Sequence, residues 1–544
     1  TPFLPRGSYA SCTQLPISCL ANIRLLVARD QLSRRKFKFI LLSNYLVGLL
    51  DFDGVQSFRS PLTFGSGVVT TNNKRRQPVP IQTEHDPRLK RALKTRHISM
   101  LALGGVIGAG LFVGSSAVIA STGPGAFITY AITGIIVALV MRMLGEMAAA
   151  HPAKGSFVDY ARMAFGRPAG YMTGWLYWYF WVIVVGFEAV VGGQIINGWF
   201  PDLPVWAIAL GLMVIMTLLN LMSVHSFGEA EYWFAGIKVA AIIVFLIVVG
   251  AYVFHLWPGS TASFSNLTEH GGFLPHGVSS LFTGVVVVIF SMTGVEVATL
   301  AAAESEDPSR NIRKAVNAVM LRILVFFVLA TFFIVVAQPW TEIEAGKSPF
   351  VATLEHIGIP GAGHMLTAVI LVAVLSVLNA GLYTSSRLLY VLASNDEAPS
   401  WVAGVSRKGV PVRGVIASTL VGYGCVVIAA IWPDTVFQFL INSSGTVFLF
   451  VYLVICLSQI KLRRKWVNEG TLKFAMWGHP WLPLLVTASI VAVLVSMAFD
   501  PSMQISLLQC LIAIAVIATS YMLFRAKRAR QQSRAVEVTP VRSA

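Results

Sequence analysis

Long runs of apolar residues, separated by short segments that carry charges, glycine or proline, dominate the chain from residue 98 onward. About 20 consecutive apolar residues are enough for a helix to cross the hydrocarbon core of a bilayer. Twelve runs approach that length, and they predict spans at 98–120, 126–149, 171–197, 205–222, 232–254, 279–303, 316–337, 365–392, 415–431, 436–457, 482–498 and 505–524. We therefore expect an all-α integral membrane protein with twelve transmembrane helices.

Composition supports a membrane protein over a soluble enzyme. Of the 544 residues, 56% are hydrophobic and 12% are charged, whereas soluble domains carry about 25% charged residues. The five cysteines show neither disulfide nor metal-ligand spacing. No pairing of nucleophile and base emerges either, so we expect no catalytic residues, no metal site and no cofactor.

The net charge of +16 lies in the two ends of the chain. Residues 1–97 hold 16 basic and 5 acidic side chains, residues 525–544 hold 6 and 1, and residues 98–524 hold 19 of each. No folded basic module accompanies this charge, which excludes nucleic acid as the expected partner. Basic segments next to spans attract the anionic headgroups of membrane lipids.

Basic residues also predict the orientation, because loops rich in Lys and Arg stay on the cytoplasmic side. Most basic residues of the body lie after even-numbered predicted spans, as in the run 461–465 (KLRRK). Both termini of this cell-membrane protein are therefore expected in the cytoplasm. Residues 1–85 lack helical or strand periodicity, and we expect a disordered basic segment or non-native upstream sequence; residues 525–544 are expected to form a basic cytoplasmic tail.

Glycines interrupt the first predicted span in the sequence GGVIGAGLFVG. Small residues allow neighbouring helices to pack closely, which is one explanation. The other is a broken helix at Gly108, Ala109 and Gly110, whose unpaired amides direct positive partial charge at an anion such as a carboxylate.

The sixth predicted span carries a matching feature, the sequence FSMTGVE at 290–296. Interrupted spans at corresponding places in two halves indicate a transporter binding site. Because five is an odd number, spans 1–5 and 6–10 have opposite topology. We expect an inverted repeat of 86–255 and 279–460, followed by spans 11 and 12 within 461–524.

Three charged residues lie well inside the predicted spans: Glu188, Lys238 and Glu296. Each is costly in lipid and should face the protein interior. Lys238 is either a side chain that snorkels to the interface, a desolvated lysine that loses a proton during transport, or a fixed cation in place of sodium. Glu296 either caps a broken helix or takes part in transport, and Glu188 is either a hydrogen-bonded structural acid or a functional one.

Several segments of this body resemble the amino acid–polyamine–organocation superfamily, and within it the bacterial amino acid permeases related to the 4-aminobutyrate (GABA) permeases. The resemblance covers about residues 85–525. It is carried by segments such as RHISMLALGGVIGAGLFVGSS at 96–116, FGEAEYWFAGIKV at 227–239, VIFSMTGVEVATLAAAE at 288–304 and LNAGLYTSSRLLYVLA at 378–393.

The resemblance implies a LeuT-like fold of five plus five helices, with spans 1 and 6 broken, and proton-coupled import of a small zwitterionic amino acid. It places the substrate carboxylate on the backbone of the first break and the ammonium group on span 6. The implied substrate-binding residues are Ile107, Gly108, Ala109, Gly110, Phe290, Ser291, Thr293 and Gly294. Lys238 and Glu296 are implied in proton coupling, and Glu188 and Asn379 are further candidates.

We expect 4-aminobutyrate as the first substrate, with an amino acid and a proton as the partners of the protein. Other neutral amino acids remain open: proline, alanine, serine, glycine or an aromatic residue. A sodium-coupled symporter of the same fold and a nutrient sensor without transport also remain open. The sequence leaves the oligomeric state undecided.

Overall fold

The computed structural model describes residues 107–151, 156–222, 224–296, 308–406, 409–472 and 474–537, of which the side chains of 156, 224–228, 230, 308, 309, 311, 433–438 and 527–537 are not described. The expectations for residues 1–85 therefore lie outside the described residues. Regular elements are all helical in the described part of the chain.

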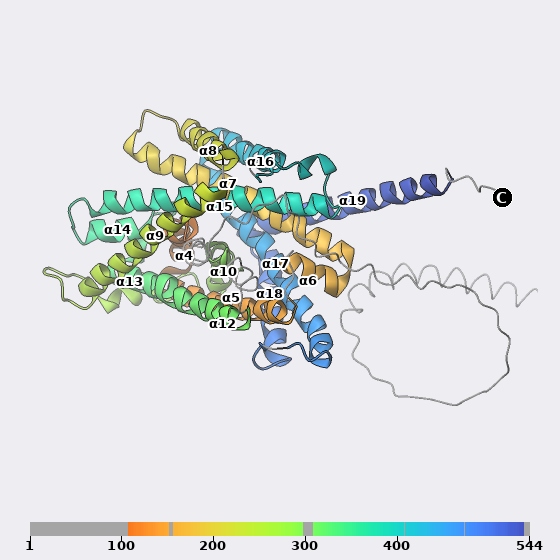
Figure 1. Cartoon of the computed structure of the whole chain (residues 1–544). Helices are drawn as coiled ribbons and strands as arrows, with labels where there is room; N and C mark the ends of the chain where they lie inside the picture. The colour runs from red at the N-terminus through yellow and green to blue at the C-terminus, as the bar shows by residue number, and fades with distance from the viewer. Residues whose placement is uncertain are drawn as a thin grey trace, which may run out of the picture. The chain divides into compact units, whose positions relative to one another are not determined.

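The chain forms a series of long helices joined by short connections (Figure 1). They are α3 (Ala109–Phe112), α4 (Gly114–Thr122), α5 (Ala126–Ala150), α6 (Ser156–Phe165), α7 (Arg167–Trp199), α8 (Val205–Met222), α9 (Val224–Val253), α10 (Ser279–Ser291), α12 (Pro308–Arg322), a π-helix (Ile323–Leu329), α13 (Ala330–Ala337), α14 (Pro349–His356), α15 (Ala362–Ser394), α16 (Val412–Ile431), α17 (Pro433–Asn468), α18 (Trp481–Phe499) and α19 (Pro501–Glu537).

Ten helical segments of the described chain are long and apolar enough to cross a membrane. The predicted spans 1 and 2 fall together in one of them, Ala109–Ala150, and the predicted span 6 corresponds to the shorter helix α10. Every predicted span thus overlaps a helix in the described part of the chain, while residues 98–106 of the first predicted span and 297–303 of the sixth lie outside the described residues. The helix α19 continues to Glu537, beyond the predicted boundary at 524 between the last span and the tail.

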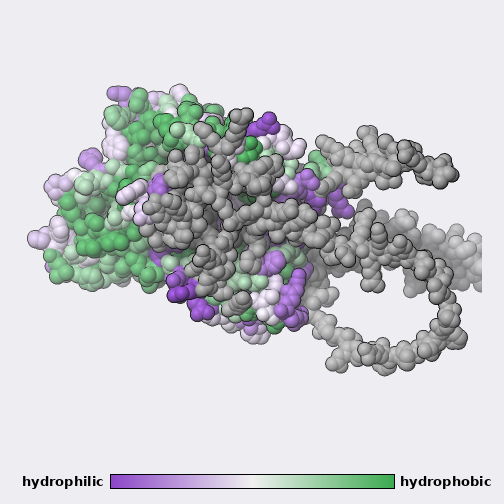
Figure 2. Space-filling model, in the orientation of Figure 1, coloured by the Kyte–Doolittle hydropathy of each residue, from purple (hydrophilic) through white to green (hydrophobic). Residues whose placement is uncertain are grey.

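Helices differ sharply in how much of their apolar surface the protein itself covers. In the most apolar stretch of α7, 78% of the residues are buried, against 22% in α8 and 6% in α19. The helix α7 packs against α6, α8, α15, α16 and α17. Large exposed apolar side chains are frequent on α8 and α9, and Figure 2 shows hydrophobic residues over this region. The bundle is therefore centred on α7, and α8, α9 and α19 present apolar surface for lipid.

A buried ion pair fastens the end of α5 to α17. The carboxylate of Glu146, which is fully buried, accepts hydrogen bonds from Gln459 Nε2 at 2.7 Å and Arg463 Nη1 at 2.5 Å. It also accepts one from the backbone N–H of Met476. Because the Glu146 carboxylate on α5 is bonded both to α17 and to the segment that follows α17, it fixes the relative position of these three parts of the chain.

Candidate functional site

The cavity between α3, α7, α10 and α15 begins where α3 starts. Gly108 is extended, with φ −141° and ψ −159°, and the helix begins at Ala109. The backbone N–H of Ala109 lies 3.3 and 3.4 Å from the two carboxylate oxygens of Glu188 on α7. A Cβ at position 108 would lie 2.7 Å from Val377 Cγ2 and 2.8 Å from Glu188 Oε1. Glycine is therefore required for Glu188 to reach this helix start.

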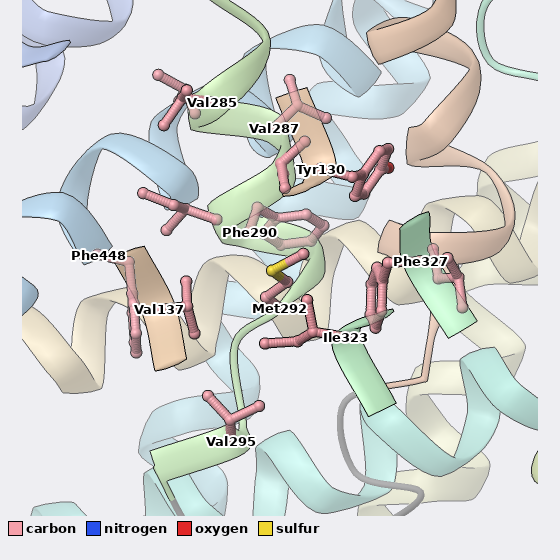
Figure 3. Packing of buried hydrophobic residues seen from close by; sticks show 14 of the residues in the cluster. Tyr130, Val137, Val285, Val287, Phe290, Met292, Val295, Ile323, Phe327 and Phe448 are labelled. Carbon is pink, nitrogen blue, oxygen red and sulfur yellow. The ribbon is translucent and has the colours of Figure 1, made fainter. Parts of the chain in front are cut away.

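The second wall is the end of α10, in the middle of the predicted span 279–303. The helix ends at Ser291, and Gly294 takes a φ of 96°, a value that L-residues with side chains rarely adopt. The Thr293 hydroxyl donates to the carbonyl of Phe290 at 2.7 Å. Figure 3 shows the chain continuing irregularly from Met292 to Val295, while Phe290 and Met292 pack among buried apolar side chains. Gly294 thus allows the backbone to turn out of the helix inside the bundle, and the Thr293 hydroxyl satisfies a carbonyl group at the helix end.

The start of α3 and the end of α10 are in direct contact. Ser291 Oγ lies 2.6 Å from the carbonyl oxygen of Gly110 and 2.9 Å from that of Val287, and it donates its proton between them. A Cβ at Gly110 would lie 2.8 Å from Ser291 Cα. The two segments can approach this closely only because position 110 has no side chain.

A small cavity lies beside this contact. Its polar lining comes from Glu188, Ser291 and Thr293, and the rest from Gly110, Trp181, Val184, Phe290 and Val377. The ring of Phe290 stands edge-on to that of Phe187, with centroids 5.0 Å apart. A mostly apolar cavity with a carboxylate, two hydroxyls and nearby helix ends suits a small zwitterion that needs few polar contacts.

Glu296 lies just beyond the break and joins it to α7. Its carboxylate accepts hydrogen bonds from the backbone N–H of Gly294 at 2.9 Å and from the hydroxyl of Tyr177 at 3.0 Å. The side chain is fully buried. The contacts are those of a cap on the interrupted helix, and they place a carboxyl group next to the turn that bounds the cavity.

Lys238 on α9 is fully buried, so the interpretation that it snorkels to the interface is wrong. Its ammonium group donates to Ser376 Oγ on α15 at 2.9 Å. It also interacts electrostatically with Glu188 and with a second acid, Glu231. The cost of removing a long cation from lipid and water is offset here by two carboxyl groups and a hydroxyl.

The sequence prediction of three charged residues inside the spans was incomplete, because Glu231 is also buried. It was missed because it stands one residue before the predicted span 232–254. Its carboxylate accepts hydrogen bonds from Ser376 Oγ at 2.6 Å and from Asn379 Nδ2 at 3.3 Å. The seven-residue spacing from Glu231 to Lys238 is two helical turns, and this was the signal that could have placed both side chains on one face of α9.

The predicted site residues thus fall into two groups. Gly110, Phe290, Ser291 and Thr293 line the cavity with the further candidate Glu188. The remaining predicted residues lie outside this lining: Ile107, Gly108 and Ala109 at the start of α3, Gly294 and Glu296 in the turn, and Lys238 and Asn379 between α9 and α15.

Comparison with known proteins adds an independent finding. Residues 97–535 match the amino acid permease family. The chain is 50% identical to the gamma-aminobutyric acid permease of Bacillus subtilis over 454 residues, which cover 83% of this chain and 97% of the relative. It is 40% identical to the gamma-aminobutyric acid permease of Escherichia coli, covering 82% and 97%, and 39% identical to the aromatic amino acid transport protein AroP of that organism, covering 82% and 98%.

Proposed function

The chain belongs to the amino acid permease family, and from that premise we propose that it imports 4-aminobutyrate together with a proton. It is a multi-pass membrane protein and a transporter, not an enzyme. The choice of 4-aminobutyrate is supported by the names of the relatives at 50% and 40% identity. The resemblance to an aromatic amino acid transporter at 39% identity keeps an aromatic substrate as the second candidate.

The observation that carries the proposal is the meeting of two helix ends at one cavity. The start of α3 offers backbone N–H groups, which favour a carboxylate, and the end of α10 offers carbonyl and hydroxyl oxygens, which favour an ammonium group. The substrate carboxylate would bind at Gly108, Ala109 and Gly110, with Ile107 behind them. The ammonium group would bind at Phe290, Ser291, Thr293 and Gly294.

Glu188 connects substrate binding to a proton. Its carboxylate already accepts the hydrogen bond from Ala109 that a substrate carboxylate would accept. Two carboxylates about 4 Å apart repel each other by about 4 kcal/mol at an effective dielectric constant of 20. Substrate would therefore bind when Glu188 is protonated or displaced, so that proton and amino acid enter the site together.

Lys238 is the second coupling residue in this proposal. The family resemblance implies that Lys238 takes the place of the sodium ion of sodium-coupled relatives, which would favour protons over sodium. Its electrostatic interaction with Glu188, which lines the cavity, would link it to the site. Glu296 would assist by holding the turn after α10 in its interrupted form.

The same proposal includes the topology. It comprises twelve spans, an inverted repeat of 86–255 and 279–460, two additional spans within 461–524, and both termini in the cytoplasm. It is supported by the overlap of each predicted span with a helix among the described residues and by the interruption after Ser291. Cysteine labelling from either side of sealed membranes tests it: a residue in 461–465 that reacts only from outside would contradict the orientation.

Uptake into liposomes tests the function. Purified protein is reconstituted, an inward proton gradient is imposed, and labelled 4-aminobutyrate is followed with each of the twenty amino acids as competitor. We expect accumulation that the proton gradient drives and that excess unlabelled 4-aminobutyrate abolishes. Protein-free liposomes and a sodium gradient at equal pH are the controls. The absence of uptake for every amino acid, or uptake that requires sodium, would overturn the proposal.

A further inference from the structure

Two consecutive hydrogen bonds connect Lys238 to Glu231 in the N-terminal part of α9. Lys238 Nζ donates to Ser376 Oγ at 2.9 Å, and Ser376 Oγ donates to Glu231 Oε2 at 2.6 Å. Both heavy-atom distances are those of well-formed hydrogen bonds. All three side chains are buried. The hydroxyl of Ser376 can accept from the lysine and donate to the acid at the same time, as a proton relay requires.

Two amide side chains hold the acid in place. Asn379 Nδ2 donates to Glu231 Oε1 at 3.3 Å, and Asn220 Nδ2 on α8 donates to the side-chain oxygen Oδ1 of Asn379 at 2.7 Å. With its Oδ1 engaged by Asn220, the amide of Asn379 presents its N–H to Glu231. The second carboxylate oxygen, Oε2, is thereby directed at Ser376. Three helices contribute to an arrangement that a simple counter-ion to Lys238 would not need.

The hydrogen-bonded residues lead from the neighbourhood of the cavity toward the N-terminal part of α9. Glu188 lines the cavity, and Lys238 interacts electrostatically with both Glu188 and Glu231. Seven residues of helix separate Glu231 from Lys238, a rise of about 10 Å. Glu231 immediately precedes the predicted span 232–254 and lies in the N-terminal part of α9, toward the end that follows α8. The hydrogen bonds therefore connect Lys238, which interacts with the cavity-lining Glu188, to an acid that borders the predicted span.

We propose that Glu231 receives, through Ser376, the proton that Lys238 releases in each transport cycle, and passes it to the cytoplasm. The N–H bond of the ammonium group breaks as Ser376 Oγ gains that proton, and the O–H bond of Ser376 breaks as Glu231 Oε2 gains one. Lys238 becomes a neutral amine and Glu231 a neutral carboxylic acid, so no charge is created in the membrane. Loss of the proton to the cytoplasm and reprotonation of Lys238 from the Glu188 side complete the cycle. The inference rests on the proposed proton coupling.

The variant Glu231→Gln separates a proton relay from a purely structural acid. Exchange of labelled for unlabelled 4-aminobutyrate, at equal concentrations and equal pH on both sides, requires no net release of a proton. Net accumulation under an inward proton gradient requires the release of a proton into the cytoplasm in each cycle. We expect Glu231→Gln to retain exchange and to lose accumulation by about 100-fold, the usual contribution of a positioned proton-transfer group.

Ser376→Ala is a second variant, which removes only the hydroxyl group that would relay the proton. Ser385→Ala is its matched control. Ser385 is a fully buried serine on the same helix, and its hydroxyl donates to the carbonyl of Leu382 at 3.3 Å. We expect Ser376→Ala to lose accumulation but keep exchange, and Ser385→Ala to keep both.

Two results would overturn the relay: accumulation by either relay variant at the wild-type level, or equal loss of exchange and accumulation in protein that unfolds at the wild-type temperature. Failure of the proposed function is distinguishable, because wild-type protein would then show no accumulation under a proton gradient.

Discussion

The contact between α3 and α10 leads to a sharp prediction for Gly110→Ala. A Cβ at this position would lie 2.8 Å from Ser291 Cα and 3.2 Å from Ser291 Oγ, whereas ordinary contacts begin at 3.4 Å. The first of these neighbours is backbone and cannot rotate away. The added methyl group therefore separates the two helix ends by several tenths of an ångström and stretches the hydrogen bond from Ser291 Oγ to the Gly110 carbonyl.

The expected cost follows from that overlap. Overpacking a well-filled interior costs about 1–3 kcal/mol. At 1.4 kcal/mol per factor of ten, the closely packed arrangement would lose population by about 5- to 150-fold. Because the contact forms one side of the proposed substrate site, the loss should fall on substrate affinity and on transport more strongly than on the fold.

The assay compares Gly110→Ala with Gly236→Ala, a variant of an exposed helical glycine on α9 with no atom within 4 Å of the added Cβ. Initial rates of labelled 4-aminobutyrate uptake and unfolding temperatures in detergent are measured for both. We expect Gly236→Ala to match wild type and Gly110→Ala to fall within the range above. A Gly110→Ala protein with wild-type uptake and stability would refute the packing argument.

Three further substitutions test other parts of the site and fold. Lys238→Ala should keep measurable binding of 4-aminobutyrate but lose accumulation under a proton gradient; unchanged accumulation would show that the lysine has no part in coupling. Glu188→Gln cannot ionise, so equilibrium binding should become insensitive to pH, whereas wild-type affinity should rise as the pH falls; a parallel pH profile in both proteins would contradict the role of Glu188. Glu146→Gln leaves Arg463 without its buried carboxylate and should cost about 3–5 kcal/mol, seen as a lower unfolding temperature with the substrate concentration for half-maximal uptake unchanged; equal unfolding temperatures would argue against the ion pair as a fastening.

The positions of the helices were predictable because a bilayer demands apolar runs of a fixed length, and those runs are visible in the sequence. In the described part of the chain, the α-helices α6 and α14 fall outside the predicted spans; they are 10 and 8 residues long. Both are too short to span, so span length carries no signal for them. Helix ends were also displaced: α17 begins at Pro433 and runs to Asn468, because a helix can continue past the apolar run into polar solvent.

The site was predictable only in part. Glycines at 108 and 110 and the polar sequence after Phe290 indicated interrupted helices, because such residues are costly in an ordinary span. That Glu188 would contact Ala109 depends on the rotation of α7 about its axis, which packing against the surrounding helices decides. The link from Lys238 to Glu231 through Ser376 joins residues more than 130 positions apart, and no local pattern could have paired them.

The low burial of α19, which packs along α7, α17 and α18, has a consequence for how its exposed side can vary. Only 6% of its most apolar stretch is buried. Shape complementarity therefore places little demand on the exposed side chains of this stretch, and hydropathy is the property that matters there. Exchanges among leucine, isoleucine, valine and phenylalanine at exposed positions such as Leu508, Ile512 and Val516 should be silent, whereas the same exchanges in α7 would disturb the packing of the bundle.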